Sequence, residues 1–172
     1  MDSESVIRAG ILGLPLVLAI IGGMPVQFEP LVQLYKKAVA HAGHDMSKLT
    51  VASHSHGFIA DTTEEAADKF FPSTQYVMNK LGKERGWSPY TRGSFDTART
   101  LEGALYVGDP KTVAEKIIYL RKNVGITRFM LHVPVGSMPH DDVMRAIELL
   151  GKEVAPLVRS EVAKWEKQES GE

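Results

Sequence analysis

The first residues of the chain place a short helix directly in front of an apolar strand. Asp2 or Ser3 can cap a helix over residues 3–12, and Gly13 can end it. The apolar run that follows, residues 14–21, is typical of a strand that is buried on both faces of a sheet. A helix that leads at once into such a strand predicts an α/β fold with a parallel sheet.

The rest of the chain repeats this alternation of helix and strand. The spacing of apolar residues and the β-rich runs predict helices over 28–43, 63–82, 110–123 and 139–167 and strands over 49–59 and 127–134. With the first strand, this gives three parallel strands in the order αβαβα-loop-αβα. Asp109 and Pro110 mark the start of one helix, and Pro72 is expected to kink or divide another.

Two segments depart from the regular pattern. Residues 83–104 are polar and aperiodic, so we expect them to form an excursion loop that is mobile or functional. Residues 168–172 are expected to form a disordered tail. The composition, 44% hydrophobic and 24% charged over 172 residues, predicts one domain that covers residues 1–172.

Charge and cysteine content exclude several classes of function. The formal net charge of −1 offers no basic field for nucleic acid. The chain has no cysteine, which excludes disulfides, thiolate metal sites and a cysteine nucleophile. Asp2 and Glu4 stand where a signal peptide needs positive charge, and the apolar stretch 11–23 is too short to span a bilayer. We therefore predict no membrane association, and a cytoplasmic location is the default.

Three segments together resemble the luciferase-like flavin monooxygenases, the family of bacterial luciferase. They are ESVIRAGILGLPLVLAIIGG (4–23), YVGDPKTVAEKI (106–117) with GITRFMLHVP (125–134), and MPHDDVMRAIELLGKEVAPLVR (138–159). The resemblance implies a (β/α)₈ TIM barrel that binds FMN or the deazaflavin F420. A complete barrel takes roughly 250 residues. We therefore expect a partial barrel, the C-terminal half, whose strands are the sixth, seventh and eighth.

The start of the opening helix is the phosphate site that the resemblance implies. Helix N-termini favour anions, because their first N–H groups lack partners and the helix dipole is positive there. Ser3, Ser5 and Arg8 stand at the matching positions and are candidate contacts to the flavin phosphate. The family usually shows Gly-(Thr/Ser)-Pro before Glu-Ser, whereas this chain has Asp2, whose charge would repel a phosphate. The alternative, that Asp2 and Ser3 only cap the helix, stays open.

The end of the first strand is the second candidate contact to the cofactor. Ile21, Gly22 and Gly23 follow this strand, and ligands of such barrels bind at the carboxyl ends of the strands. The competing interpretation is that Ile21 is a core residue and that the two glycines only form a permissive turn.

Three histidines are candidates for the substrate side. His54 and His56 are two residues apart in a predicted strand, so they point to the same face, whereas Ser53 and Ser55 point to the other. That face is either the barrel lumen or the helix layer, and His132 on the last predicted strand is a candidate for the same lumen. No third ligand is evident beside His54 and His56, so we predict no metal site.

The resemblance implies a flavin-dependent monooxygenase, or an F420-dependent oxidoreductase, that acts on a small organic substrate. Its catalytic residues and most of its flavin contacts would lie in the other half of the barrel, so none is assigned here. The alternative is a non-catalytic half-barrel that associates with itself, as a homodimer, or with a complementary half. In both cases the cofactor, where present, supplies the reactive chemistry.

Overall fold

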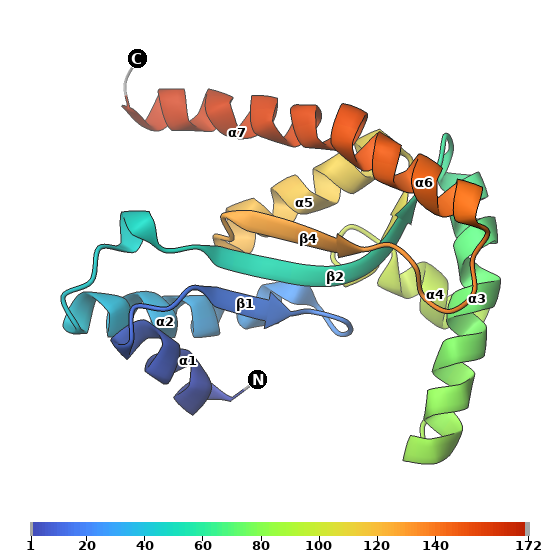
Figure 1. The fold of residues 1–172 in the computed structure, drawn as a ribbon, viewed down its shortest axis with the longest axis horizontal. Helices are drawn as coiled ribbons and strands as arrows, with labels where there is room; N and C mark the ends of the chain where they lie inside the picture. The colour runs from blue at the N-terminus through green and yellow to red at the C-terminus, as the bar shows by residue number, and fades with distance from the viewer. Residues whose placement is uncertain (1, 171–172) are drawn as a thin grey trace.

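The computed structural model describes residues 2–170, which form a parallel sheet flanked by helices (Figure 1). In chain order the elements are α1 (Ser3–Ile11), β1 (Leu16–Ala19), α2 (Glu29–His41), β2 (Val51–Ile59), α3 (Thr63–Arg85), α4 (Arg92–Ala98), β3 (Tyr106–Gly108), α5 (Pro110–Val124), β4 (Arg128–His132), α6 (His140–Leu149) and α7 (Ala155–Ser170). One π-helical turn, Leu150–Val154, joins α6 to α7. The predicted α/β alternation is confirmed.

Strand β2 lies at the centre of the sheet and is parallel to each of its neighbours. The register pairs Leu16–Ala19 with Val51–His54, Arg128–His132 with Ala52–His56, and Tyr106–Gly108 with Gly57–Ile59. Strand β3 is a fourth strand that the sequence did not predict, because a three-residue strand is too short to show a period.

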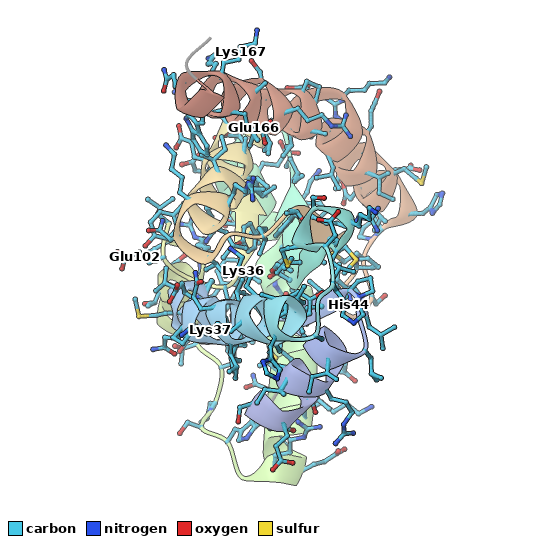
Figure 2. All side chains as sticks on the ribbon, turned by 90° about the vertical axis from the view of Figure 1, so that its left-hand side faces the viewer. Lys36, Lys37, His44, Glu102, Glu166 and Lys167 are labelled. Atoms are coloured by element: carbon cyan, nitrogen blue, oxygen red, sulfur yellow. The ribbon has the colours of Figure 1, made fainter. Side chains whose placement is uncertain are left out.

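One face of the sheet packs against the helices. Leu16, Leu18 and Val51 point to this face and are at most 5% exposed. The helix residues that join them in the core include Val32 and Tyr35 of α2, Phe70 of α3 and Leu120 of α5. In the side view of Figure 2, α7, marked by Glu166, lies above α5. Helix α5 in turn lies above α2, which is marked by Lys36 and Lys37.

Two caps confirm the helix starts that the sequence indicated. Thr62 caps α3 through a hydrogen bond from the Glu65 N–H, and Asp109 caps α5 by accepting from the Thr112 N–H. The Thr63 hydroxyl also donates to Asp109 Oδ2 at 2.7 Å, which ties the start of α3 to the start of α5. Partial burial acts against ionisation of Asp109, but these hydrogen bonds hold its pKa below the usual value.

The segment 83–104 is more regular than predicted. Helix α3 continues to Arg85 without being divided at Pro72. Residues Arg92–Ala98 form α4, whose Phe95 is fully buried and meets the Phe71 ring at 5.2 Å between centroids. The prediction of an aperiodic loop was therefore wrong for α4, because a seven-residue helix with one buried anchor shows no apolar period.

The end of the chain also differs from its prediction. Helix α7 continues through Ser170, so residues 168–170 are helical, whereas a disordered tail was expected from residue 168. Residues 171–172 lie outside the described part of the chain. Among the residues that the structure describes, no helix is long and apolar enough to cross a membrane.

Candidate functional site

The second face of the sheet is the candidate site, and we call it the open face. Residues paired in a parallel register point to the same side, and sides alternate along a strand. The open face is made of Val17 and Ala19 of β1, Ala52, His54 and His56 of β2, and Arg128, Met130 and His132 of β4. Val17 is 46% exposed, whereas Leu16 and Leu18 beside it are buried. The alternation therefore separates a helix-covered face from a solvent-exposed one.

Three imidazoles gather on the open face across β2 and β4. The ring centroids of His56 and His132 are 5.1 Å apart, those of His54 and His132 are 5.5 Å apart, and those of His54 and His56 are 6.5 Å apart. The sequence predicted that His54 and His56 share a face and gave His132 as a candidate for the same lumen; the register places all three on one face. We call these three side chains the histidine cluster.

Among the described residues, no carboxylate acts on His56, the member of the histidine cluster whose pKa is shifted. His56 is about half-buried, and burial, followed by the charges of His132 and His54, lowers its pKa below the usual value. None of the residues of β1, β2 and β4 is acidic. Among the described residues, no group of three His, Cys, Asp or Glu side chains is arranged to hold a metal ion.

The segment after β1 lies at the carboxyl end of that strand, as predicted. The Ile20 N–H donates to the His54 carbonyl at 2.9 Å, so the parallel pairing extends just past β1 before the chain turns. Ile21 is 63% exposed, which does not support the core interpretation of this residue. A Cβ added at Gly22 would meet no atom within 4 Å, and Gly23 has a φ of +75° that favours glycine.

Helix α1 begins with a side-chain cap. Asp2 Oδ1 accepts a 2.7 Å hydrogen bond from the Ser5 N–H, and hydrogen bonds from Ser5 hold the pKa of Asp2 below the usual value. Ser3, Ser5 and Arg8 are exposed along α1. Because α1 and β1 run in opposite directions, this N-terminus faces the carboxyl end of the sheet (Figure 1). The Ser5 N–H is therefore already paired with a carboxylate, whose negative charge disfavours a phosphate at the start of α1.

Lys116 is a buried amine that the sequence analysis missed. It is 1% exposed, and its Nζ donates to the carbonyl oxygens of Thr100 and, at 3.0 Å, Gly103. Burial, with a smaller effect of the Arg99 charge, lowers the pKa of Lys116 to about 7. A signal was present, since Lys116 lies in the inner stripe of α5, next to Ile117. It faces the core, so it belongs to the scaffold and not to the open face.

The structure also shows a hollow on the outer side of β4. It has a volume of about 420 Å³ and lies between α5, β4 and α7. Its lining is mainly apolar with a charged rim, and it includes Ile117, Ile126, Phe129, Val158, Val162, Arg121, Arg128, Arg159 and Glu166. It is separate from the histidine cluster.

Solved structures share this fold. One is the monooxygenase RslO1 from Streptomyces bottropensis, with a TM-score of 0.76, 23% identity, and coverage of 90% of this chain and 45% of that one. The oxygenating constituent of 3,6-diketocamphane monooxygenase from Pseudomonas putida, in complex with FMN, has a TM-score of 0.64 and 23% identity, covering 88% and 45%. The coenzyme F420-dependent tetrahydromethanopterin reductase of Methanopyrus kandleri has a TM-score of 0.60 and 24% identity, covering 90% and 48%.

Sequence comparison agrees with this likeness. The 5,10-methylenetetrahydromethanopterin reductase of Methanopyrus kandleri is 29% identical over 152 residues, which are 77% of this chain and 42% of that protein. The chain thus spans less than half the length of the relatives it matches. The family model described as luciferase-like monooxygenase matches residues 1–128. The fold of the chain is the partial luciferase-like barrel that the three sequence segments predicted, and the chain belongs to the luciferase-like monooxygenase family.

Proposed function

We propose that this chain contributes the open face of a flavin-dependent monooxygenase that uses FMN, or of a related F420-dependent oxidoreductase, acting on a small organic substrate. The observation that carries the proposal is the open face itself, with its histidine cluster, in a chain of this family. The likeness to a monooxygenase in complex with FMN and to an F420-dependent reductase supports both cofactors as candidates.

The exposed residues of β1 and of the turn after it offer a surface for the flat ring of such a cofactor. Val17 and Ile21 offer exposed apolar side chains on this part of the sheet, and the space around Gly22 admits a ring close to the backbone. When bound, a reduced flavin supplies either a hydride or the electrons that activate oxygen. The chain's own residues orient the ring and hold the substrate near His54, His56 and His132.

Binding of FMN is the direct test of this proposal. We expect weak binding by the 172-residue chain, because Asp2 occupies the Ser5 N–H and adds a negative charge where a phosphate would bind. Asp2→Ser keeps a capping oxygen and removes the charge, so it should strengthen FMN binding about threefold, in line with charge effects at helix termini. Quenching of FMN fluorescence measures the affinity.

Asp45→Ser is the matched control for this experiment. Asp45 is likewise an exposed N-cap, here of the short 3₁₀ helix Met46–Lys48, and it accepts from the Ser47 N–H. It precedes β2 and so lies toward the amino end of the sheet. Its replacement should leave FMN binding unchanged. Submicromolar binding that Asp2→Ser does not alter would contradict the role given to Asp2. Absence of both FMN and F420 binding in every variant would remove the proposed function from this chain alone.

The outer edges of the sheet support a second candidate, a half-barrel that forms a homodimer. Among the described residues β1 and β4 pair with β2 only, so each leaves one edge unpaired. Leu12 and Leu14, just before β1, are 60% and 51% exposed, and the apolar hollow lies along the first residues of β4. A second copy could place the leucines of one edge in the hollow of the other, which closes both edges by a two-fold axis.

Leu12→Glu should therefore shift the chain toward monomer. A carboxylate placed in the hollow would lose the apolar contact, and about tenfold weaker association is expected from the burial of one leucine. Sedimentation velocity at several concentrations measures this. Leu101→Glu is the control, since Leu101 is similarly exposed at 49% but lies between α4 and β3. A monodisperse monomer of the unmodified chain at micromolar concentration would refute the dimer.

A further inference from the structure

The three rings of the histidine cluster are close enough to share one ligand group. Centroid separations of 5.1 to 6.5 Å put the rings of His54, His56 and His132 in contact with one another, so a single group seated on the open face would meet all three. His132 is exposed, and the other two are partly exposed, so solutes can reach the cluster from the open face. Each neutral imidazole can donate one N–H bond, and each protonated imidazole can donate two.

The charges around the cluster favour an anion. Strand β1 contributes no titratable group, and Arg128 of β4 lies four positions before His132 and lines the separate hollow between α5, β4 and α7. The acids of α3 and α6, which also pack against β2, include Asp142 and Glu65, paired with Lys69, and Glu148, paired with Arg145. Within residues 2–170, His132 and His54 are the charged groups that act on His56, and no carboxylate does so.

The neighbouring strand supplies an apolar surface. Val17 on β1 points to the open face, and Ile21 continues the same alternation just beyond the strand; they are 46% and 63% exposed. A ligand seated on the cluster can therefore extend an apolar body along β1.

We propose that the histidine cluster is a binding subsite for the carboxylate of an organic acid whose apolar body lies against Val17 and Ile21. This deepens the proposed function and rests on it in one respect, that the open face holds the substrate. The imidazole N–H groups donate to the carboxylate oxygens, and the anion in turn stabilises protonated imidazole. Binding and proton uptake by the cluster are therefore coupled.

Histidine NMR on the 172-residue chain, with benzoate as the probe, tests this subsite. Saturating benzoate should raise the titration midpoints of His54, His56 and His132 by about one pH unit, as expected for a facing opposite charge. The chain has six histidines, so the remaining three, His41, His44 and His140, serve as internal controls whose midpoints should stay unchanged. Benzyl alcohol, which has the same ring but no charge, should leave all six unchanged.

Substitution of the exposed member of the cluster gives an independent readout. His132→Gln should weaken benzoate binding about tenfold, the loss expected for one charge-assisted hydrogen bond. His140→Gln, at the start of α6, should have no effect. Three results would each overturn the proposal: no midpoint change with benzoate, equal changes in all six histidines, or an equal effect of benzyl alcohol. An equal effect of inorganic phosphate would overturn the assignment to organic acids.

Flavin binding separates this inference from the proposed function. If benzoate acts on the cluster but neither FMN nor F420 binds any variant, the subsite stands and the proposed function fails. If FMN binds and benzoate does not affect the cluster, only the subsite fails. The fluorescence and NMR titrations are run on the same protein, so the two outcomes are not confused by folding.

Discussion

Replacing Gly57 with alanine is expected to destabilise the fold by about 3 kcal/mol, at the upper end of the range for overpacked positions. A Cβ at this position would lie 2.2 Å from the Tyr106 carbonyl oxygen and 2.6 Å from Leu131 Cδ1. The oxygen belongs to the backbone of β3, so relief requires β2 and β3 to move apart and weakens their pairing. Urea unfolding followed by circular dichroism measures the loss.

Gly22→Ala is the matched control for Gly57→Ala. No atom lies within 4 Å of the Cβ that it would add, so its effect should stay within about 0.5 kcal/mol, as is usual for surface substitutions. Both variants make the same change to the unfolded chain, and their difference therefore reports the native contact. Equal unfolding midpoints for the two variants would show that the pairing of β2 with β3 does not depend on the close approach of Gly57 to the Tyr106 carbonyl.

The parts of the fold that the sequence predicted are those with a local physical signal. The apolar run before Ile21 and the alternation through His54 and His56 indicated β1, β2 and the two faces of the sheet, because burial repeats every second residue in a strand. The cap at Asp109 was predictable because a helix needs an acceptor for its first N–H groups. These signals lie within a few residues of the structure they specify.

The parts that were missed depend on distant contacts. Helix α4 is held by Phe95, which packs on Phe71 of α3, and a single anchor has no periodicity. Lys116 finds carbonyl partners 16 and 13 residues earlier in the chain, at Thr100 and Gly103. Lysine is ordinarily a surface residue, so its place in the inner stripe of α5 has meaning only when these partners are known.

In the candidate site, too, the features with a local signal were predicted from the sequence, whereas those that depend on distant contacts needed the structure. Alternation alone put His54 and His56 on one side, but bringing His132 beside them required the pairing of β2 with β4, which joins residues about 76 positions apart. At α1 the resemblance implied a phosphate site, and the local chemistry of Asp2 gave the opposite expectation. The capping hydrogen bond that Asp2 accepts from the Ser5 N–H agrees with the local chemistry.

Lys116 makes the stability of the fold depend on pH in a direction that can be stated in advance. Its pKa is about 7 in the folded chain, against 10.5 for an unperturbed lysine. Between these values the unfolded chain holds a proton that the folded chain has released, so unfolding takes up a proton and stability rises with pH. Below pH 7 both states are protonated, and the folded state carries the full cost of a buried charge.

The free energy of unfolding should therefore increase by about 2 kcal/mol between pH 7 and pH 9, since each pH unit contributes at most ~1.4 kcal/mol. Lys116→Met keeps the side-chain bulk and removes the titrating amine, so this increase should largely disappear. The exposed Lys111 on the same helix provides the control, and Lys111→Met should keep the slope. Urea unfolding at several pH values gives the slope for each variant.

The slope is the decisive quantity here, because Lys116→Met also leaves the carbonyl groups of Thr100 and Gly103 without their donor and so lowers stability at every pH. That loss is constant with pH and cancels from the comparison. Equal slopes in the unmodified chain and in Lys116→Met would mean that the folded amine stays protonated. In that case the two carbonyl oxygens and the Tyr106 ring, 5.1 Å from Nζ, compensate the buried charge without help from solvent.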